Sequence, residues 1–425
     1  MSAPAWASHF GRAWTSPEAV AAHVPHQATL ATSLIEPTTV LEALAQREDS
    51  GGKAWVAVAA MGALALGQTG RFKIVTCFAS PVYEALEPSG VCEYLPALFS
   101  DAERLFRELK PDCVLLRLSP PDDQGLCSYG WASAFSPHLF ESARAAGIPI
   151  LAEIDPAMPR TRSGMEVPAA EVAAACLAGG EAAIDEPGAM SRNAEKVGAH
   201  LEAFVPDGAT LQVGIGSVPD AAVAGLGARR LGIHTEVLSR GLARLVASGQ
   251  ADGSEKSEDK GVAVCTIASK DPEVRALVED TARTEVRASS RVLDPRVIAR
   301  HDNLRCINSA LAVDLRGQVN AETLGWSQVA GVGGQLDFFR GAGLRDDALR
   351  IIVLGSTTSK GESRIVASHA PGAVVTATRY DIDLVVTEHG SAWLRNQTDE
   401  ARAKALIEVA DPAHREALDR NRFGA

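Results

Sequence analysis

The sequence predicts an α/β protein of two related open sheets, each covered by helices. The chain has 425 residues, too many for one ordinary hydrophobic core and suited to two domains of roughly 200 residues each. Strand-like segments alternate with segments of helical spacing, as crossover connections between parallel strands require. Residues 113–118 form a nearly continuous apolar run, which is typical of a strand buried on both faces.

The first half contains the first set of alternating elements. Leu105, Phe106 and Leu109 share one side of a helix predicted over 100–109. The other elements expected here are helices near 16–24 and over 138–146, and strands after residue 28, at 72–78, 113–118 and 148–154. Around 177–195 the composition turns to Gly, Ala, Glu, Pro and Asn, so we place the domain boundary at residue 190. The predicted domains are therefore 1–190 and 191–425.

The second half restarts the alternation. A strand over 209–216 is followed by a helix with Pro219 in its first turn and Ser217 as its expected cap. Leu304–Leu315 alternates apolar and polar residues and is expected to be a strand that leads toward a glycine-rich loop. Residues 251–261 are polar and charged, which predicts a solvated loop. Further strands are expected at 263–267, 351–354 and 383–387, and helices at 399–409 and 412–420.

Composition excludes several classes of protein. The net charge of −12 argues against non-specific binding to nucleic acid or to an anionic membrane surface, and no apolar run is long enough to span a membrane. Seven isolated cysteines without a CxxC pair fit a reducing cytoplasm, and the start of the chain does not resemble a signal peptide. No HExxH or CxxC arrangement is present, so no metal site is expected.

Two glycine-containing turns are candidate ligand sites. The strand ending in Gly214 and Gly216 runs into a helix N-terminus, which suits an oxyanion or phosphate. Gly331, Gly333 and Gly334 would let bare backbone N–H groups approach a ligand. A strand followed by an ordinary tight turn, with no ligand, is an equally good interpretation of either segment by itself.

Eight segments, taken together, go further than these single turns. In the second half they are Gly214–Asp220, Gly232–Glu236, Ile307–Leu311, Gly317–Glu322, Gly331–Phe338 and Thr387–Arg395, and in the first half Ser119–Gly130 and Asp155–Thr161. This ordered set resembles the acetyl-CoA hydrolase/transferase family, in particular its butyrate and 4-hydroxybutyrate CoA-transferase branch. The resemblance covers nearly the whole chain.

The resemblance implies two CoA-transferase-type α/β/α domains with an active-site cleft between them. It also implies coenzyme A as a substrate rather than a permanently bound cofactor, a short carboxylic acid as the second substrate, and a glutamate nucleophile. Paired domains of this type often dimerise, so a homodimer is expected. The residues that match the family's site are Gly214 and Gly216 in an amide-lined turn, Gly331, Gly333, Gly334 and Gln335 in the loop that contacts the thioester and the CoA arm, and Glu388 at the mouth of the site.

One position departs from the family pattern. We expect the nucleophile in Asn-Ser-x-x-Glu-Val-Asp-Leu, where this chain has Ala312 followed by Val313-Asp314-Leu315. A methyl group cannot form an anhydride. Three explanations remain open: natural divergence with altered or lost chemistry, an engineered replacement, or takeover by a different carboxylate, for which Glu322 and Glu388 are nearby but not obvious candidates.

Three functions follow from these alternatives. The first is an enzyme that transfers or hydrolyses short acyl-CoA thioesters by an altered mechanism. The second is a catalytically inactive acyl-CoA-binding homologue or partner subunit. The third is a related pair of α/β domains that binds an unrelated small ligand, such as a sugar phosphate.

Overall fold

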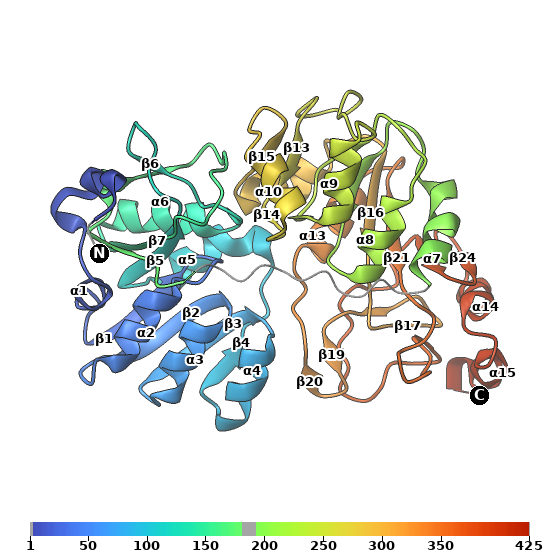
Figure 1. Ribbon diagram of the computed structural model, residues 1–425. Coiled ribbons are helices and arrows are strands. Elements are labelled where there is room, and N and C mark those ends of the chain that lie inside the picture. The colour runs from blue at the N-terminus through green and yellow to red at the C-terminus, as the bar shows by residue number, and fades with distance from the viewer. Residues whose placement is uncertain (1–2, 181–192, 425) are drawn as a thin grey trace. The chain divides into compact units, whose positions relative to one another are not determined.

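The computed structural model describes residues 3–180 and 193–424 (Figure 1). The chain divides into two compact units. Unit 1 comprises Met1–Ile184, Thr266–Lys270 and Val278–Arg291, and unit 2 comprises Asp185–Cys265, Asp271–Leu277 and Val292–Ala425. The predicted boundary at residue 190 lies outside the described residues. The sequence did not predict that two short segments beyond residue 265 group with unit 1.

Unit 1 is built on a parallel sheet ordered, among the described residues, β4-β3-β2-β1-β5-β7-β9. The chain adds strands outward from β1 to β4 and then returns to add β5, β7 and β9 on the other side of β1. Such a reversal is the topological switch point of a doubly wound sheet. The strands are β1 Gln27–Thr32, β2 Gly51–Val58, β3 Phe72–Phe78, β4 Cys92–Tyr94, β5 Cys113–Leu118, β7 Ile150–Ile154 and β9 Ala174–Leu177, with a small antiparallel pair of β6 Leu126–Cys127 and β8 Val167–Pro168.

Helices of unit 1 form two packed sets. Helix α2 packs against α1 and α3, and α5 packs against α6. Because β-α-β crossovers are right-handed, helices that follow strands added in opposite directions cover opposite faces of the sheet. Strand β5 is accordingly buried along its whole length, as predicted. The helices are α1 Pro17–Ala21, α2 Thr38–Gln46, α3 Met61–Gln68, α4 Pro81–Leu86, α5 Ala102–Leu109 and α6 Ser136–Ala146, while β14 Ile267–Ala268 and β15 Thr284–Val286 lie in the later segments.

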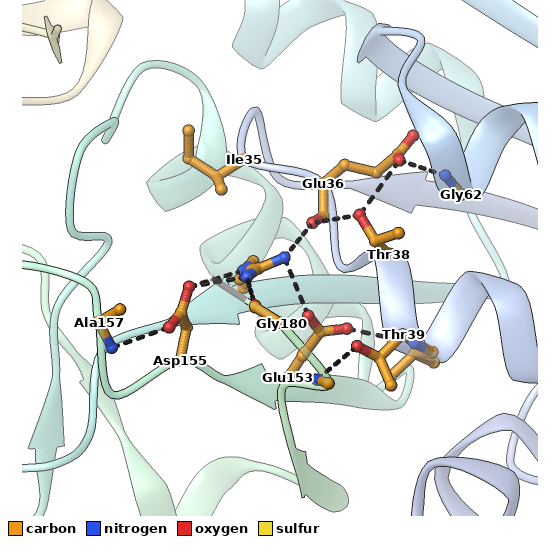
Figure 2. Close-up of polar contacts among 12 residues, drawn as sticks. Ile35, Glu36, Thr38, Thr39, Gly62, Glu153, Asp155, Ala157 and Gly180 are labelled. Atoms are coloured by element: carbon orange, nitrogen blue, oxygen red, sulfur yellow. Dashed lines mark hydrogen bonds and ion pairs between the residues drawn. The ribbon is translucent and has the colours of Figure 1, made fainter. Parts of the chain in front are cut away.

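A buried ionic cluster lies where the carboxyl ends of β1, β5 and β7 meet, at this switch point (Figure 2). The Arg117 guanidinium donates through Nε and Nη2 to Asp155 at 3.1 and 2.7 Å, and its Nη1 lies 3.1 Å from Glu153. The Glu36 carboxylate accepts from the Gly62 and Ala63 amides at 2.7 and 3.1 Å, so it caps the N-terminus of α3. The cluster thus ties four elements of unit 1 together.

Burial raises the pKa values of two carboxyl groups in this cluster, Glu153 and Glu36. Glu153 is fully buried, and burial raises its pKa from 4.5 to about 7, although Arg117 and the Thr39 and Val40 amides oppose the rise. Burial also raises the pKa of Glu36. Glu153 is therefore largely protonated in the folded protein at mildly acidic pH.

Stability of the wild-type protein is expected to fall, relative to a Glu153→Gln variant, as the pH rises from about 4.5 to about 8. A raised carboxyl pKa contributes stability that is fully present below the unfolded value of 4.5 and is lost as the pH rises through the folded value of about 7. The full difference is about 3 kcal/mol. Urea unfolding of both proteins at a series of pH values measures it, and parallel curves would contradict the assignment to Glu153.

Unit 2 has a second open sheet, ordered β11-β10-β16-β21-β23-β24 among the described residues. The first five strands are parallel and β24 is antiparallel at the edge. The switch point here lies between β10 and β16. The strands are β10 Thr210–Val213, β11 Gly232–Ile233, β16 Leu304–Asn308, β21 Leu349–Val353, β23 Leu384–Thr387 and β24 Gly390–Trp393. These two doubly wound sheets confirm the predicted fold class.

The remaining elements of unit 2 are short. A small sheet is ordered β18-β17-β22, and β19 pairs with β20 in a hairpin. The bounds of these strands are β17 Ala312–Asp314, β18 Val319–Asn320, β19 Thr323–Leu324, β20 Ser327–Gln328 and β22 Ile365–Val366. Two other short strands are β12 Val237–Leu238 and β13 Ala263–Cys265. The later helices of the chain are α7 Ala194–Leu201, α8 Ser217–Ala224, α9 Arg240–Ala247, α10 Pro272–Val278, α11 Ser289–Val292, α12 Pro295–Ile298, α13 Gln335–Ala342, α14 Asp399–Val409 and α15 Arg415–Arg420.

Two predictions about local structure, at β16 and at the start of α8, were wrong. Residues 304–315 are not one alternating strand: β16 is buried on both faces, including Arg305, and β17 belongs to the separate small sheet. Helix α8 is capped by Gly216 rather than Ser217, because the chain turns at Gly216 with φ 146°. Among the described residues, no helix has both the length and the apolar character that a membrane crossing needs.

Candidate active site

The carboxyl ends of the parallel strands in unit 2 bring three predicted site residues to one edge of the sheet. Gly214 and Gly216 follow β10, and Glu388 follows β23. At the same edge, Asn308 is the last residue of β16 and Ser309 follows it. This edge is where open α/β sheets bind ligands. A further carboxylate, Glu236, enters the same edge after β11.

Glu236 lies against the glycine-rich loop. Its Oε2 accepts a 2.7 Å hydrogen bond from the Gly334 amide, at the N-terminus of α13. The side chain is only 7% exposed. Burial raises its pKa from 4.5 to about 7; the Gly334 hydrogen bond lowers it, and the nearby Asp337 carboxylate raises it further. A buried carboxylate that titrates near neutrality beside backbone donors is a candidate nucleophile or base.

The turn that carries Glu236 is held by both preceding side chains. The His234 Nε2 lies 2.9 Å from the Val292 carbonyl. The Thr235 hydroxyl lies 3.2 Å from both the amide and the carbonyl of Val213, at the end of β10. The carboxylate is therefore presented from a rigid strand end rather than from a mobile loop, which suits a catalytic group.

Glycine is required where the loop meets Glu236. A Cβ added at Gly334 would lie 2.7 Å from the Glu236 Oε2 and 2.7 Å from the Leu293 side chain. Gly333 has φ 54°, in the left-handed region that favours glycine. Gly331, half-buried, begins this loop. The predicted glycine loop is thus the surface that receives a carboxylate.

For the acyl-CoA activity that the resemblance implies, replacing Gly334 by alanine should lower turnover by about 10²-fold, because the new methyl group displaces the Glu236 carboxylate from the Gly334 amide. Steady-state kinetics with one acyl-CoA measures the loss. Gly355→Ala is the matched control, since its added Cβ comes no closer than 3.6 Å to the atoms around it. Equal activity of the two variants would contradict the steric argument.

Gln335 and the Gly214–Gly216 turn converge on the end of β16. The Gln335 Nε2 donates to the Ser309 carbonyl at 3.1 Å. A Cβ at Gly214 would lie 2.4 Å from the Asn308 Oδ1, so only glycine fits there. Asn308 is itself fixed by a reciprocal pair of amide hydrogen bonds with Gln212, at 2.8 and 3.1 Å. The two predicted turns are therefore neighbours, linked through residues 308–309.

Comparison with known proteins identifies the family. The family model of the acetyl-CoA hydrolase/transferase C-terminal domain matches residues 272–422. The 4-hydroxybutyrate coenzyme A transferase of Clostridium kluyveri is 36% identical over 334 residues, covering 78% of this chain and 77% of that protein. The chain belongs to the acetyl-CoA hydrolase/transferase family.

Solved structures of related proteins have the same fold. RipA from Yersinia pestis superposes with a TM-score of 0.90 at 30% identity over 98% of each chain. The 4-hydroxybutyrate CoA-transferase of Porphyromonas gingivalis gives a TM-score of 0.78 at 26% identity, again over 98% of each chain. Coenzyme A transfer is thus the chemistry of named members of this acetyl-CoA hydrolase/transferase family.

Glu388 occupies a different place on the edge from Glu236. The ends of β11 and β23 are four strand spacings apart, or about 19 Å. The Glu388 carboxylate accepts from the Ser356 amide and hydroxyl at 2.8 and 2.9 Å and from the Asn193 side chain at 2.6 Å. The residue is half-buried, with its side chain 6% exposed, and these three bonds use most of its acceptor capacity. Its visible role is to fasten the ends of β21, β23 and α7.

Ala312 lies in the small sheet, at the start of β17, where it pairs with Asn320 of β18. Nothing in these contacts tests whether a glutamate would belong there, so the assignment of Ala312 as a lost nucleophile stays a prediction. Glu236, by contrast, was missed as a catalytic candidate. It ends the Gly232–Glu236 segment that contributed to the resemblance, and that segment was the available signal, because no strand was predicted before it.

Metal binding has no visible support in the part of the chain that the structure describes. No group of three or more His, Cys, Asp or Glu side chains there could hold a metal ion. All seven cysteines are buried, and none of them forms a disulfide in the described part of the chain. The arrangement instead offers a carboxylate and backbone amides, which suits acyl transfer.

Proposed function

We propose that the chain moves coenzyme A between short carboxylic acids, with Glu236 as the nucleophile. The observation that carries this proposal is the buried Glu236 carboxylate held 2.7 Å from the Gly334 amide, at the carboxyl edge of the unit 2 sheet. It supports, among the explanations for Ala312, the one in which a different carboxylate carries the reaction. The family and its CoA-transferase members support the reaction type.

The steps balance without a metal or redox cofactor. A Glu236 oxygen attacks the thioester carbonyl, the C–S bond breaks, and an acyl-glutamyl anhydride and CoA thiolate form. The thiolate then attacks the Glu236 carbonyl, which releases the first acid as its carboxylate and leaves a glutamyl-CoA thioester. A second carboxylate repeats the two steps in reverse and departs as the new acyl-CoA. Attack by water on either intermediate gives hydrolysis.

The surroundings of Glu236 suit these steps. Burial and the Asp337 charge destabilise the carboxylate, which makes it more nucleophilic than a solvated one. Each addition places negative charge on an oxygen bonded to the attacked carbon. The Gly334 amide, which already donates to Glu236, is a candidate donor to the oxyanion that forms when the thiolate attacks the Glu236 carbonyl, and the Gly333 amide beside it is a candidate donor to the substrate oxyanion. The Gly216 amide, in the turn after β10, is a further candidate donor, whereas the Gly214 amide already donates to the Ile307 carbonyl at 2.8 Å.

Incubation with acetyl-CoA or butyryl-CoA and a panel of free acids tests the proposal. We expect new acyl-CoA to form, and mass spectrometry of digested protein to find CoA attached to the peptide that contains Glu236. Absence of CoA exchange with every acid, together with absence of thiol release, would defeat it. The acyl chain preferred by the enzyme is an outcome of the same panel.

Restoring a carboxylate at residue 312 separates the two accounts of the mechanism. If Glu236 is the nucleophile, Ala312→Glu should give no gain and at most a loss of a few-fold, because β17 pairs this position with Asn320. A gain of tenfold or more, measured as CoA exchange, would revive the prediction that Ala312 marks a lost nucleophile. Ala312→Gln controls for size.

The alternative function, an inactive acyl-CoA binder or partner subunit, is motivated by Ala312 alone. Calorimetry with CoA decides it when turnover is absent: binding without exchange supports this function, and no binding at millimolar CoA excludes it. We also propose a homodimer, on the grounds of the family's paired domains, and a reducing cytoplasm, on the grounds of seven buried cysteines without a disulfide among the described residues. Light scattering at several concentrations tests the dimer.

A further inference from the structure

Lys256 is buried against β11, the strand that leads into the turn carrying Glu236. The composition of 251–261 predicted a solvated loop, and for Lys256 this was wrong: its side chain is only 1% exposed, although Glu255 and Ser257 beside it are exposed. The ammonium donates to the Ile233 carbonyl at 3.0 Å and to the Val262 carbonyl at 2.6 Å. Burying a charge is costly unless its hydrogen bonds are strong, so this placement requires an explanation.

Gly232 makes the space that Lys256 occupies. A Cβ added at Gly232 would lie 2.3 Å from the Lys256 Cγ and 3.0 Å from its Cδ. The lysine stem therefore runs directly across the backbone of β11. Gly232 and Ile233 form the whole of β11, and Glu236 is the third residue after Ile233.

The contacts of Lys256 complete the anchoring of this turn. His234 and Thr235 are held through their side chains, at Val292 and Val213. The Ile233 carbonyl, at the point where the chain leaves β11, is held by the Lys256 ammonium. An ammonium has three donors and can join carbonyls of two segments at once, which an apolar side chain of equal length cannot do.

We propose that Lys256 is a positioning residue for Glu236: it fixes the end of β11 and so places the carboxylate against the Gly334 amide. This inference rests on the proposed function, in which Glu236 is the nucleophile. Lys256 and Gly232 share this role, because the lysine stem fits against β11 only where residue 232 has no side chain. A displacement of about 1 Å at a reacting group costs about 10²-fold in rate.

Replacing Lys256 by methionine, which keeps most of the apolar stem, tests this role. We expect kcat to fall 10- to 100-fold while KM for acyl-CoA stays within about threefold. Amide hydrogen exchange should become faster at His234 and Thr235, whose amides bond to Leu211 and Val264. Lys260→Met, an exposed lysine of the same loop, is the control and should match wild type in both measurements.

A double-mutant cycle with Gly232 gives the second measurement. Gly232→Ala alone should reproduce the loss of kcat, because the new methyl group and the lysine stem cannot coexist. In a Lys256→Ala background the same change should cost much less, since the stem is gone. Additive losses would overturn the inference, as would wild-type kcat and wild-type exchange in Lys256→Met. If Lys256→Met does not fold, Gly232→Ala alone decides the matter, because wild-type kcat in that variant would overturn the inference.

The two proposals fail in different ways. If the wild-type protein exchanges no CoA, the proposed function falls, and hydrogen exchange in Lys256→Met still reports whether the lysine holds the turn. If the wild-type protein is active and both lysine measurements are unchanged, only the positioning role falls.

Discussion

Glu236→Gln should lower CoA transfer by at least about 10³-fold while leaving the fold intact. The amide has nearly the same shape and can still accept from Gly334, but it cannot attack a thioester and form an anhydride. The CoA adduct on the peptide containing residue 236 should disappear as well. Initial rates of acyl-CoA formation and mass spectrometry measure the two effects.

Glu322→Gln is the matched control, because Glu322 is a half-buried carboxylate that hydrogen-bonds Gln328 beside the glycine loop. It should retain activity within a few-fold of wild type. More than a tenth of wild-type activity in Glu236→Gln, or an adduct on another peptide, would transfer the nucleophile to a different residue. Wild-type turnover should also rise as the pH increases through about 7, since only the ionised carboxylate attacks.

Arg117→Met should destabilise unit 1 by about 3 to 5 kcal/mol. The change leaves Asp155 and Glu153 buried without their cation, and removing one partner of a buried ionic cluster has a cost of this size. It also removes the hydrogen bond that Arg117 donates to the Gly180 carbonyl at 2.6 Å. Urea unfolding and calorimetry of the whole protein measure the loss in whichever transition reports unit 1.

Arg104→Met serves as the control, because Arg104 and Asp101 form an exposed ion pair of the same unit. It should cost less than about 1 kcal/mol. A second test adds Glu153→Gln to Arg117→Met, which should recover part of the lost stability at pH 8 by removing an unpaired charge. Equal losses in the two arginine variants would show that the buried cluster contributes no more than a surface pair.

Local patterns were enough for the framework. Apolar runs such as residues 113–118 identified strands buried in parallel sheets, and α14 begins and ends where the helical spacing placed it. These features depend on neighbouring residues, whose side chains decide which backbone conformation buries apolar surface. The order of eight short motifs then identified the family, and the family fixed the fold of both units.

Contacts between distant segments were beyond such patterns. Glu236, whose carboxylate faces the glycine loop, is 98 positions away from Gly334 in the sequence. The sequence offered several carboxylates and no measure of which one would be buried. The same limit applies to Glu388, which the resemblance placed at the mouth of the site and whose bonds to Ser356 and Asn193 only the structure shows.

By itself the sequence determined the α/β class, most of the elements and the membership of an acyl-CoA-processing family, because periodicity and motif order are local or linear properties. Only the tertiary structure decided that Glu236, rather than a residue near Ala312, lies against Gly334, and that Lys256 is inside. Burial, and with it the pKa of a carboxylate or the position of a cation, depends on which strand ends the sheet topology places side by side.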